Sequence, residues 1–292
     1  MFEGTYTAIV TPFAGGGVDE EALRALVREQ VEAGVDGIVP CGSTGESATL
    51  DHAEHERVIA ICVEEAAGRV KVIAGTGSNS TREAARLTAF ARGAGADAAL
   101  LISPYYNKPT QEGHVVHYRE IAAAAGDLPL IIYNIPGRTG VNMTPETIAR
   151  IAEIPQVVGV KEASGSLDQV SRIIALAGEE FTVLSGDDSL TLPMMAVGAK
   201  GVISVTSNLL PRRFAELVRA AAAGDFATAR AIHFELLPLM QALFLETNPI
   251  PVKTALAMLG KIRDELRLPL TPMSPEPRAR LERVLAECGL KP

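Results

Sequence analysis

The sequence predicts an α/β protein, a closed (β/α)8 TIM barrel with a C-terminal helical extension. Short apolar runs rich in β-branched residues alternate with stretches of helical periodicity, and eight such strand–helix units follow one another. Alternating units of this kind form a parallel sheet with right-handed crossovers. The chain has 292 residues, which is enough for a barrel of about 250 residues and further helices. A doubly wound sheet is the alternative, but no glycine-rich dinucleotide loop follows the first strand.

The first unit shows how the elements are identified. Residues 6–10 form an apolar strand that stops at Thr11 and Pro12. Asp19 is a suitable N-cap, apolar residues then recur at helical spacing, and Gly34 ends the helix. The other expected strands are 36–40, 70–74, 98–102, 130–134, 157–162, 181–185 and 201–205. The other expected helices are 51–67, 81–95, 111–125, 145–154, 167–177, 190–198 and 212–223.

The C-terminal part of the chain has a different pattern. No strand is evident after about residue 225, and prolines at 249, 251, 269, 272, 275 and 277 divide the segment into short helices. We therefore divide the chain into a barrel, 1–224, and a helical extension, 225–292. The extension is expected to pack on the barrel or on another subunit.

Composition argues against several classes of protein. The net charge of −8 provides no basic surface for nucleic acid. No run of 18 apolar residues is present, so no membrane span is expected. The N-terminus lacks the basic and apolar regions of a secretory signal, and a cytoplasmic location is expected. Cys41, Cys62 and Cys288 have no metal-ligand spacing and fit reduced thiols.

Lys161 is the most informative position, because it lies at the end of the expected strand 157–162. In barrels of this type the active site forms at the C-terminal ends of the strands. Burial lowers the pKa of an ammonium group, and a neutral amine can attack a carbonyl carbon to form a Schiff base. At the ordinary pKa of about 10.4, only about one lysine in 2,500 is neutral at pH 7. The alternative is a structural lysine paired with Glu162 or another acid.

Other polar residues follow neighbouring strands. Ser43 and Thr44, in a glycine-rich turn, can hold a carboxylate through hydroxyls and backbone amides, or can cap the next helix. Tyr133 lies one strand from Lys161, where a phenol can move a proton or simply pack. Arg138 can bind a substrate carboxylate or form a salt bridge.

Three further patterns are interpreted as structural. Asp187 and Asp188 are expected to form the N-cap and first turn of the next helix. His52 and His55 lie three residues apart on the second helix, and no metal is expected there. The segment 75–80 resembles a dinucleotide-binding loop but lacks its third glycine and follows the third strand.

Eight ordered segments resemble the pyruvate-dependent class I aldolases and lyases, the N-acetylneuraminate lyase family typified by dihydrodipicolinate synthase. The resemblance runs from Gly4 to about Pro272, and its GRTG segment is typical of the synthases. The segments are GSTGESATL (42–50), VIAGTGSNST (72–81), SPYYNKPTQEG (103–113), IIYNIPGRTGVN (131–142), VVGVKEASG (157–165), LSGDDS (184–189), GVISVTSN (201–208) and NPIPVK (248–253).

The resemblance implies a set of catalytic residues. Lys161 would form the Schiff base with pyruvate, and Tyr133 would donate and accept the proton. Ser43 and Tyr106 would complete a hydroxyl relay, with Tyr106 reaching in from a neighbouring subunit. The synthases usually carry threonine at the position of Ser43. Serine keeps the hydroxyl but restricts its rotamer less, which weakens the substrate assignment slightly.

The resemblance also implies the substrates and the residues that bind them. Thr44 would hold the pyruvate carboxylate, the backbone at Gly186 and Ile203 would line the pocket, and Arg138 would bind the carboxylate of aspartate semialdehyde. The expected product is 4-hydroxy-tetrahydrodipicolinate, at the first committed step of diaminopimelate and lysine biosynthesis. No metal or organic cofactor is expected.

An allosteric site for L-lysine, the end product, is implied at a tight-dimer interface. The expected assembly is a homotetramer, a dimer of tight dimers. The alternative at this interface is a polar contact without a ligand. The matching positions are Ser47, Ala48, His52, His55, Asn79, Glu83 and Tyr105.

Two other functions stay open from the sequence. One is a sister aldolase acting on a sialic acid or a 2-keto-3-deoxy sugar acid, against which the Gly137–Gly140 segment argues. The other is a non-catalytic barrel that binds a keto acid as a sensor. A substrate panel tests the first, and borohydride trapping of pyruvate tests the second.

Overall fold

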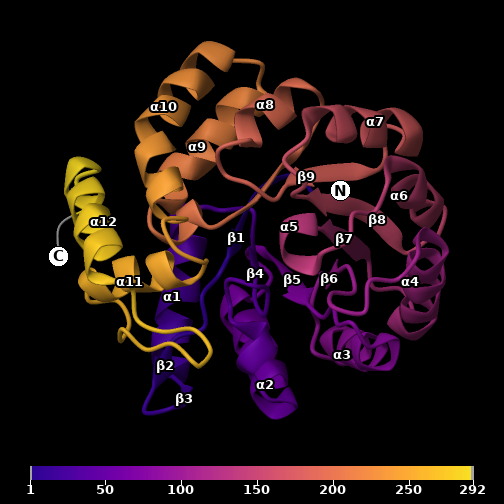
Figure 1. Ribbon diagram of the computed structural model, residues 1–292, viewed down its shortest axis with the longest axis horizontal. Helices are drawn as coiled ribbons and strands as arrows, with labels where there is room; N and C mark the ends of the chain where they lie inside the picture. Colours follow the sequence, from indigo (N-terminus) through magenta and orange to yellow (C-terminus); the bar gives the residue numbers. More distant parts are fainter. Residues whose placement is uncertain (1, 291–292) are drawn as a thin grey trace.

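The computed structural model describes residues 2–290 and confirms the (β/α)8 barrel (Figure 1). Eight parallel strands close in chain order, and the first strand pairs with both the second and the last. The barrel strands are β1 (Gly4–Ala8), β4 (Gly37–Val39), β5 (Lys71–Gly75), β6 (Ala98–Ile102), β7 (Leu130–Asn134), β8 (Val157–Glu162), β9 (Thr182–Ser185) and β10 (Gly201–Ser204).

The expected helices surround the barrel (Figure 1). Asp19 caps the first of them by accepting a hydrogen bond from the backbone N–H of Ala22, and Gly34 ends it in the left-handed conformation, as predicted. The helices are α1 (Glu20–Ala33), α2 (His52–Ala66), α3 (Thr81–Gly93), α4 (Gln111–Ala125), α6 (Pro145–Ala152), α7 (Leu167–Ala177), α8 (Thr191–Ala196) and α9 (Pro211–Ala222).

Several short elements and boundaries differ from the prediction. The hairpin β2 (Phe13–Ala14) and β3 (Gly17–Val18), the helix α5 (Pro136–Thr139) and the 3-10 turns Ser47–Thr49 and Thr206–Asn208 were not expected. The first strand begins and ends two residues earlier than predicted. The N–H of Val10 bonds to the side chain of Asn208 at 3.3 Å, not to a neighbouring strand.

The apolar core has two parts. One lies between the strands and the surrounding helices. The other fills the barrel interior, where Tyr6, Leu100, Tyr133, Leu184 and Ile203 are among the packed side chains. The barrel interior is therefore filled with side chains. Substrates can bind only at its upper end, where the strands have their C-terminal ends.

The extension packs on the barrel, as one of the two expected arrangements. It consists of α10 (Phe226–Ala242), α11 (Ile250–Met258) and α12 (Pro275–Glu287), with no strand between residues 225 and 290. It lies beside α1 and α9 (Figure 1) and shares their apolar cluster through residues such as Leu236 and Leu256. The division of the chain at residue 225 stays a prediction. No described helix is long and apolar enough to cross a membrane.

Candidate active site

Lys161 and Tyr133 are neighbours at the barrel mouth. Strands β7 and β8 pair them directly in register. Because side chains alternate along a strand, both point to the same face, into the barrel. The Lys161 Nζ lies 4.2 Å from the centroid of the Tyr133 ring. The predicted proximity of the two residues is therefore confirmed.

The environment of Lys161 favours the neutral amine. Burial lowers its pKa to about 7; the negative charge of Asp188 opposes this shift, and the positive charge of Arg138 adds to it. A pKa near 7 leaves roughly half of the lysine neutral at pH 7. Lys161 is only 7% exposed and forms no ion pair among residues 2–290.

The structural alternative for Lys161, a pair with Glu162, is wrong. Glu162 points to the other face of β8. Its carboxylate accepts hydrogen bonds from the Ser164 N–H at 2.7 Å and from the Asn134 side chain at 3.0 Å. The acid beside the lysine in the sequence is therefore fully engaged elsewhere.

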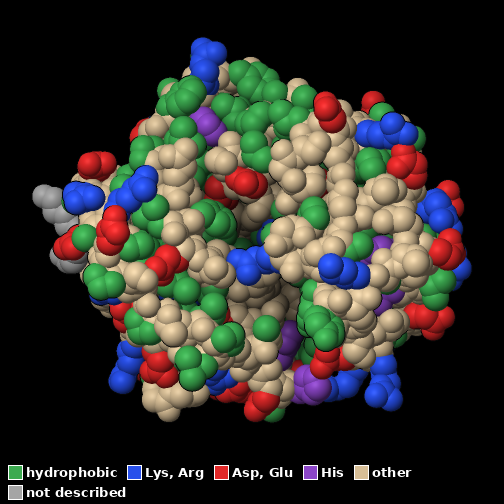
Figure 2. All heavy atoms as spheres, viewed as in Figure 1, with side chains coloured by type: hydrophobic (Ala, Val, Ile, Leu, Met, Phe, Trp, Pro, Cys, Tyr) green, Lys and Arg blue, Asp and Glu red, His purple; other side chains and the backbone are tan. Residues whose placement is uncertain are grey.

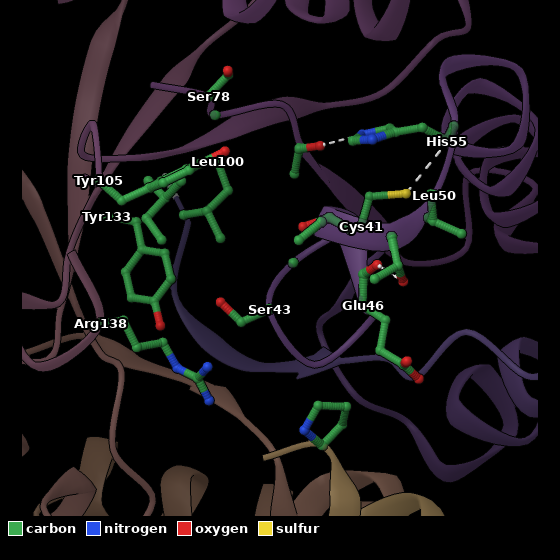
Figure 3. A pocket seen from close by; sticks show the side chains of 18 of the residues that line it. Cys41, Ser43, Glu46, Leu50, His55, Ser78, Leu100, Tyr105, Tyr133 and Arg138 are labelled. Atoms are coloured by element: carbon green, nitrogen blue, oxygen red, sulfur yellow. Dashed lines mark hydrogen bonds between the residues drawn. The ribbon is translucent and has the colours of Figure 1, made fainter. Parts of the chain in front are cut away.

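Tyr133 is a phenol held in the protonated form. Burial raises its pKa to about 12, while the charge of Arg138 and a hydrogen bond with Ser43 oppose the shift. Figure 3 shows the phenol oxygen pointing towards Ser43 and Arg138. At neutral pH this group can donate a proton, and a hydroxyl partner lies within reach to pass one on.

Gly186 lies directly beside Lys161, and Ile203 belongs to the apolar cluster of the barrel interior. A Cβ at Gly186 would lie 3.1 Å from the Lys161 Cε and 2.7 Å from the Ala163 Cβ, so only glycine fits beside the lysine. Ile203 is buried in the apolar cluster that also contains Tyr133. Gly186 therefore lies next to Lys161, while the predicted role of both residues in lining the substrate pocket stays a prediction.

The predicted role of Asp187 and Asp188 as a helix cap is wrong. The helix α8 begins three residues later at Thr191, and no side chain caps it. Asp188 is buried, and its Oδ2 accepts hydrogen bonds from the backbone N–H groups of Val205 and Thr206. It thereby links the ends of strands β9 and β10. Its negative charge is the one that opposes the fall in the pKa of Lys161.

Two of the predicted substrate-binding residues, Thr44 and Arg138, form hydrogen bonds with the same residue of the extension, Asn248. Arg138 Nη2 donates to the backbone oxygen of Asn248 at 2.8 Å, and the Asn248 Nδ2 donates to the Thr44 Oγ1 at 3.0 Å. Sequence reasoning did not identify Asn248, although the motif containing it was noted. Only the tertiary structure brings residues 44, 138 and 248 together.

A second contact missed by the sequence lies beneath the same loop. Glu46, with a left-handed φ of 51°, forms an ion pair with Lys253 of α11. Their side chains are 1% and 0% exposed. The Lys253 Nζ also lies 4.1 Å from the centroid of the Phe13 ring. The one available signal was a lone lysine within the apolar run of α11.

A cavity of about 460 Å³ connects three of the predicted active-site residues with most of the predicted lysine-binding residues, whereas Lys161 and Thr44 are not among its lining residues. Ser43, Tyr133 and Arg138 line one end. Figure 2 shows the hollow at the centre of this face. The residues of the predicted lysine site that line the cavity are Ser47, Ala48, His52, His55, Glu83 and Tyr105.

The predicted lysine site is polar and partly pre-ordered. His52 Nε2 lies 2.7 Å from a Glu83 carboxylate oxygen, and the other oxygen accepts from Ser78. Hydrogen bonds from Ser78 and then His52 lower the pKa of Glu83, so it is ionised at neutral pH. His55 is buried and donates from Nε2 to the Gly75 oxygen at 2.7 Å.

Asn79 and Tyr106 lie outside this cavity. The Asn79 side chain donates to the backbone oxygen of Tyr105 at 3.3 Å and thereby supports the loop. Tyr106 is 89% exposed and has a left-handed φ of 68°. Among the described residues it forms no hydrogen bond with Tyr133 or Ser43, and its predicted role in a neighbouring subunit stays a prediction.

No group of three or more histidine, cysteine, aspartate or glutamate residues within the described part of the chain has the geometry to hold a metal ion. The polar groups at the barrel mouth are instead a lysine, a tyrosine, an arginine and hydroxyls. This donor set suits carboxylate binding and covalent carbonyl chemistry.

Comparison with known proteins gives a consistent match along the chain. The model of the dihydrodipicolinate synthetase family matches residues 1–288. The 4-hydroxy-tetrahydrodipicolinate synthase of Nitratidesulfovibrio vulgaris is 58% identical over 291 residues, covering 99% of each chain. The crystal structure of dihydrodipicolinate synthase from Aquifex aeolicus is 54% identical, with a TM-score of 0.97 and 99% of each chain covered.

Two other similar structures contain ligands. The dihydrodipicolinate synthase of Acinetobacter baumannii, solved in complex with pyruvate, is 46% identical with a TM-score of 0.97. The alignment covers 99% of this chain and 100% of the chain in that structure. The enzyme from Cyanidioschyzon merolae, solved with lysine bound, is 42% identical with a TM-score of 0.96 and 99% coverage of each chain.

Proposed function

The chain belongs to the dihydrodipicolinate synthetase family, and from that premise we propose that it condenses pyruvate with L-aspartate 4-semialdehyde to 4-hydroxy-tetrahydrodipicolinate. It is a lyase, as its relatives are. The proposed reaction is the first committed step of diaminopimelate and lysine biosynthesis, carried out in the cytoplasm. The observation that carries the proposal is the buried Lys161, with its pKa lowered to about 7, against the Tyr133 ring.

The chemistry begins at Lys161. Its neutral amine attacks the ketone carbon of pyruvate, and loss of water leaves an iminium. The iminium withdraws electrons, so a proton leaves the pyruvate methyl group and an enamine forms. The enamine carbon attacks the aldehyde carbon of the second substrate and makes the new carbon–carbon bond. The amine of that substrate then displaces Lys161, closing the ring and freeing the lysine.

Tyr133 and Ser43 move the protons in this scheme. With its pKa raised to about 12, the Tyr133 phenol stays protonated and can donate to the alkoxide and hydroxyl groups that form. Ser43 relays the proton, and we propose that Tyr106 of a neighbouring subunit completes the path to solvent. The iminium is itself the electron sink, so the proposed reaction requires no metal or organic cofactor.

The two substrate carboxylates are assigned to separate groups. We propose that Thr44 holds the carboxylate of pyruvate and that Arg138 holds that of aspartate semialdehyde. Arg138 presents a planar fork of donors that suits a carboxylate, and it lies on the short helix α5 after β7, beside Tyr133. A relative solved with pyruvate supports the first substrate.

Borohydride reduction tests the covalent step directly. With pyruvate present, reduction should add one pyruvate-derived group at Lys161 and nowhere else, as mass spectrometry of peptides would show. Labelling at another lysine, or none at all, would refute the proposed chemistry. Trapping without consumption of aspartate semialdehyde would shift the assignment to a sister aldolase, and a panel of keto-acid adducts would then identify its substrate.

We further propose that L-lysine inhibits the enzyme from the other end of the cavity. The ionised Glu83 carboxylate suits an ammonium group, and Tyr105 offers a hydrogen-bond donor to a carboxylate. A relative solved with lysine supports this site. Turnover measured with and without L-lysine tests it, and turnover indifferent to lysine would reduce these residues to a polar interface.

The proposed assembly is a homotetramer, a dimer of tight dimers. Hydrophobic side chains gather near α8 and α10 at the top of Figure 2. Val197, at the end of α8, and Phe234, within α10, are 41% and 62% exposed. Exposed apolar patches of this kind suit contacts between subunits. Sedimentation analysis would test the tetramer, and replacement of Phe234 by serine should weaken it.

A further inference from the structure

We propose that Asn248 is a positioning residue that makes the Thr44 hydroxyl a committed hydrogen-bond donor to the pyruvate carboxylate. This inference rests on the proposed function, because it assumes that Thr44 binds that carboxylate. It assigns part of the active site to the C-terminal extension, which the barrel rule alone would leave out.

The direction of one hydrogen bond carries the argument. The Asn248 Nδ2 donates to the Thr44 Oγ1 at 3.0 Å. A hydroxyl has one proton and accepts through its lone pairs, whereas a carboxylate can only accept. Because Thr44 accepts from the amide, its own proton stays free for another acceptor. A pyruvate carboxylate placed at the loop would receive it.

Asn248 also joins the two proposed carboxylate subsites. Its backbone oxygen accepts from the Arg138 Nη2 at 2.8 Å. Thr44 follows β4 and Arg138 lies after β7, and these strands are separated in the barrel by β5 and β6. No strand pairing links the two loops directly. Asn248, which is only 5% exposed, bridges them from the extension.

The surrounding contacts keep Asn248 in place. Five residues later on α11, Lys253 forms the buried ion pair with Glu46, two residues beyond Thr44. The second Glu46 oxygen accepts from the backbone N–H of Arg267 at 3.1 Å. The extension therefore contacts the Gly42–Ser47 loop at two residues, Thr44 and Glu46. These two contacts hold Asn248 in position relative to Thr44.

Two substitutions separate this role from simple packing. Asn248→Ala removes the amide and should raise the KM for pyruvate by about tenfold, as expected for one lost orienting bond to a group that binds a charge. Asn248→Asp has the same shape but can only accept, so it would take the Thr44 proton and repel pyruvate. It should raise the same KM by about a hundredfold.

The control variant is Thr254→Val, on α11, the helix that begins two residues after Asn248. The Thr254 hydroxyl is buried without a hydrogen-bond partner, so removing it should leave all kinetic constants unchanged. Asn248→Ala should leave the KM for aspartate semialdehyde within about twofold, since the backbone oxygen that holds Arg138 remains. If either Asn248 variant fails to fold, Asn248→Ser replaces it, because the shorter side chain cannot reach Thr44.

A double-mutant cycle with Thr44→Val completes the test. If Asn248 acts through Thr44, Asn248→Ala adds nothing to the KM for pyruvate in the Thr44→Val background. An Asn248→Asp enzyme with the unaltered KM for pyruvate would overturn the proposal, as would additive effects in the cycle. Borohydride trapping of pyruvate on the unaltered protein separates the two hypotheses: if trapping succeeds and the Asn248 variants behave like Thr254→Val, only the role of Asn248 is refuted.

Discussion

Two buried lysines in this molecule show how the same side chain serves opposite purposes. Lys161 and Lys253 each lie over an aromatic ring, Tyr133 at 4.2 Å and Phe13 at 4.1 Å. Burial lowers the pKa of both. Lys253, however, touches the Glu46 carboxylate, which favours its charged form, whereas Lys161 has no ion-pair partner within the described residues.

The difference lies in the partner, not in the degree of burial. A buried ammonium that contacts a carboxylate stays charged and ties two segments together. A buried ammonium without such a contact loses its proton near neutral pH and becomes a nucleophile. The charge of Asp188 acts on Lys161 but is already held by backbone N–H groups, so it limits the fall in pKa without forming a pair.

Replacing the nucleophile should give the largest effect. Lys161→Met should lower kcat by at least about 10⁴-fold, as expected when a covalent nucleophile is removed. The variant should also be more stable to unfolding, because an unpaired buried amine is lost. Turnover above about one-thousandth of the unaltered rate would mean that another group carries the chemistry.

The stability of Lys161→Met should depend on pH in a defined direction. The folded pKa is about 7, and the unfolded value is about 10.4. Between these values the unfolded chain binds more protons, so Lys161 lowers stability most below pH 7, and the penalty fades as pH rises towards 10. The variant should gain up to roughly 4 kcal/mol at pH 6 and little at pH 10, by urea unfolding.

Removing the paired lysine should have the reverse effect. Lys253→Met leaves the Glu46 charge buried without its cation, which costs about 3–5 kcal/mol of unfolding free energy. The double variant Glu46→Gln/Lys253→Met removes both charges and should regain most of this loss. Urea unfolding measures both. If the Lys253→Met variant were as stable as the parent, the ion pair would contribute nothing to the free energy of unfolding. The contrast drawn between the two lysines would then be wrong.

Tyr133→Phe should have an intermediate effect on catalysis. The ring that lies over Lys161 remains, but the proton donor is lost, so kcat should fall about 10²- to 10⁴-fold, while borohydride still traps pyruvate. This result would separate proton transfer from the burial of the lysine. An unchanged kcat would assign the proton transfer to another group.

The smallest effect on catalysis and stability is expected at the exposed pair His52–Glu83. Their side chains are 53% and 37% exposed, so Glu83→Ala should change stability by at most about 1 kcal/mol. Catalysis without lysine should be unchanged, while the lysine concentration needed for half inhibition should rise. Inhibition curves for the two proteins test this, and equal curves would remove Glu83 from the lysine site.

The sequence pattern predicted the fold and the central pair for a local reason. Alternating strands and helices fix a parallel barrel, and such a barrel brings the ends of all its strands to one face. Tyr133 and Lys161 end adjacent strands, so their proximity followed without knowledge of side-chain packing. The same logic placed Arg138 near them.

Prediction from the local sequence pattern failed where a residue's partner is distant in the sequence. Asp188 follows a strand and precedes a helix, which is the pattern of a cap, yet it bonds to residues 205 and 206. A carboxylate accepts equally well from any backbone N–H. Its neighbours in space therefore decided its role, and those neighbours were not visible in the local pattern.

The sequence by itself thus determined the barrel, its helical extension and the lysine–tyrosine pair, because periodicity and strand order are local properties of the chain. Only the tertiary structure decided that Lys161 is unpaired and Lys253 paired, and that Asn248 reaches Thr44 across more than two hundred residues. These outcomes depend on packing between distant segments. That packing sets the pKa of a lysine and the direction of a hydrogen bond, and no local pattern encodes either.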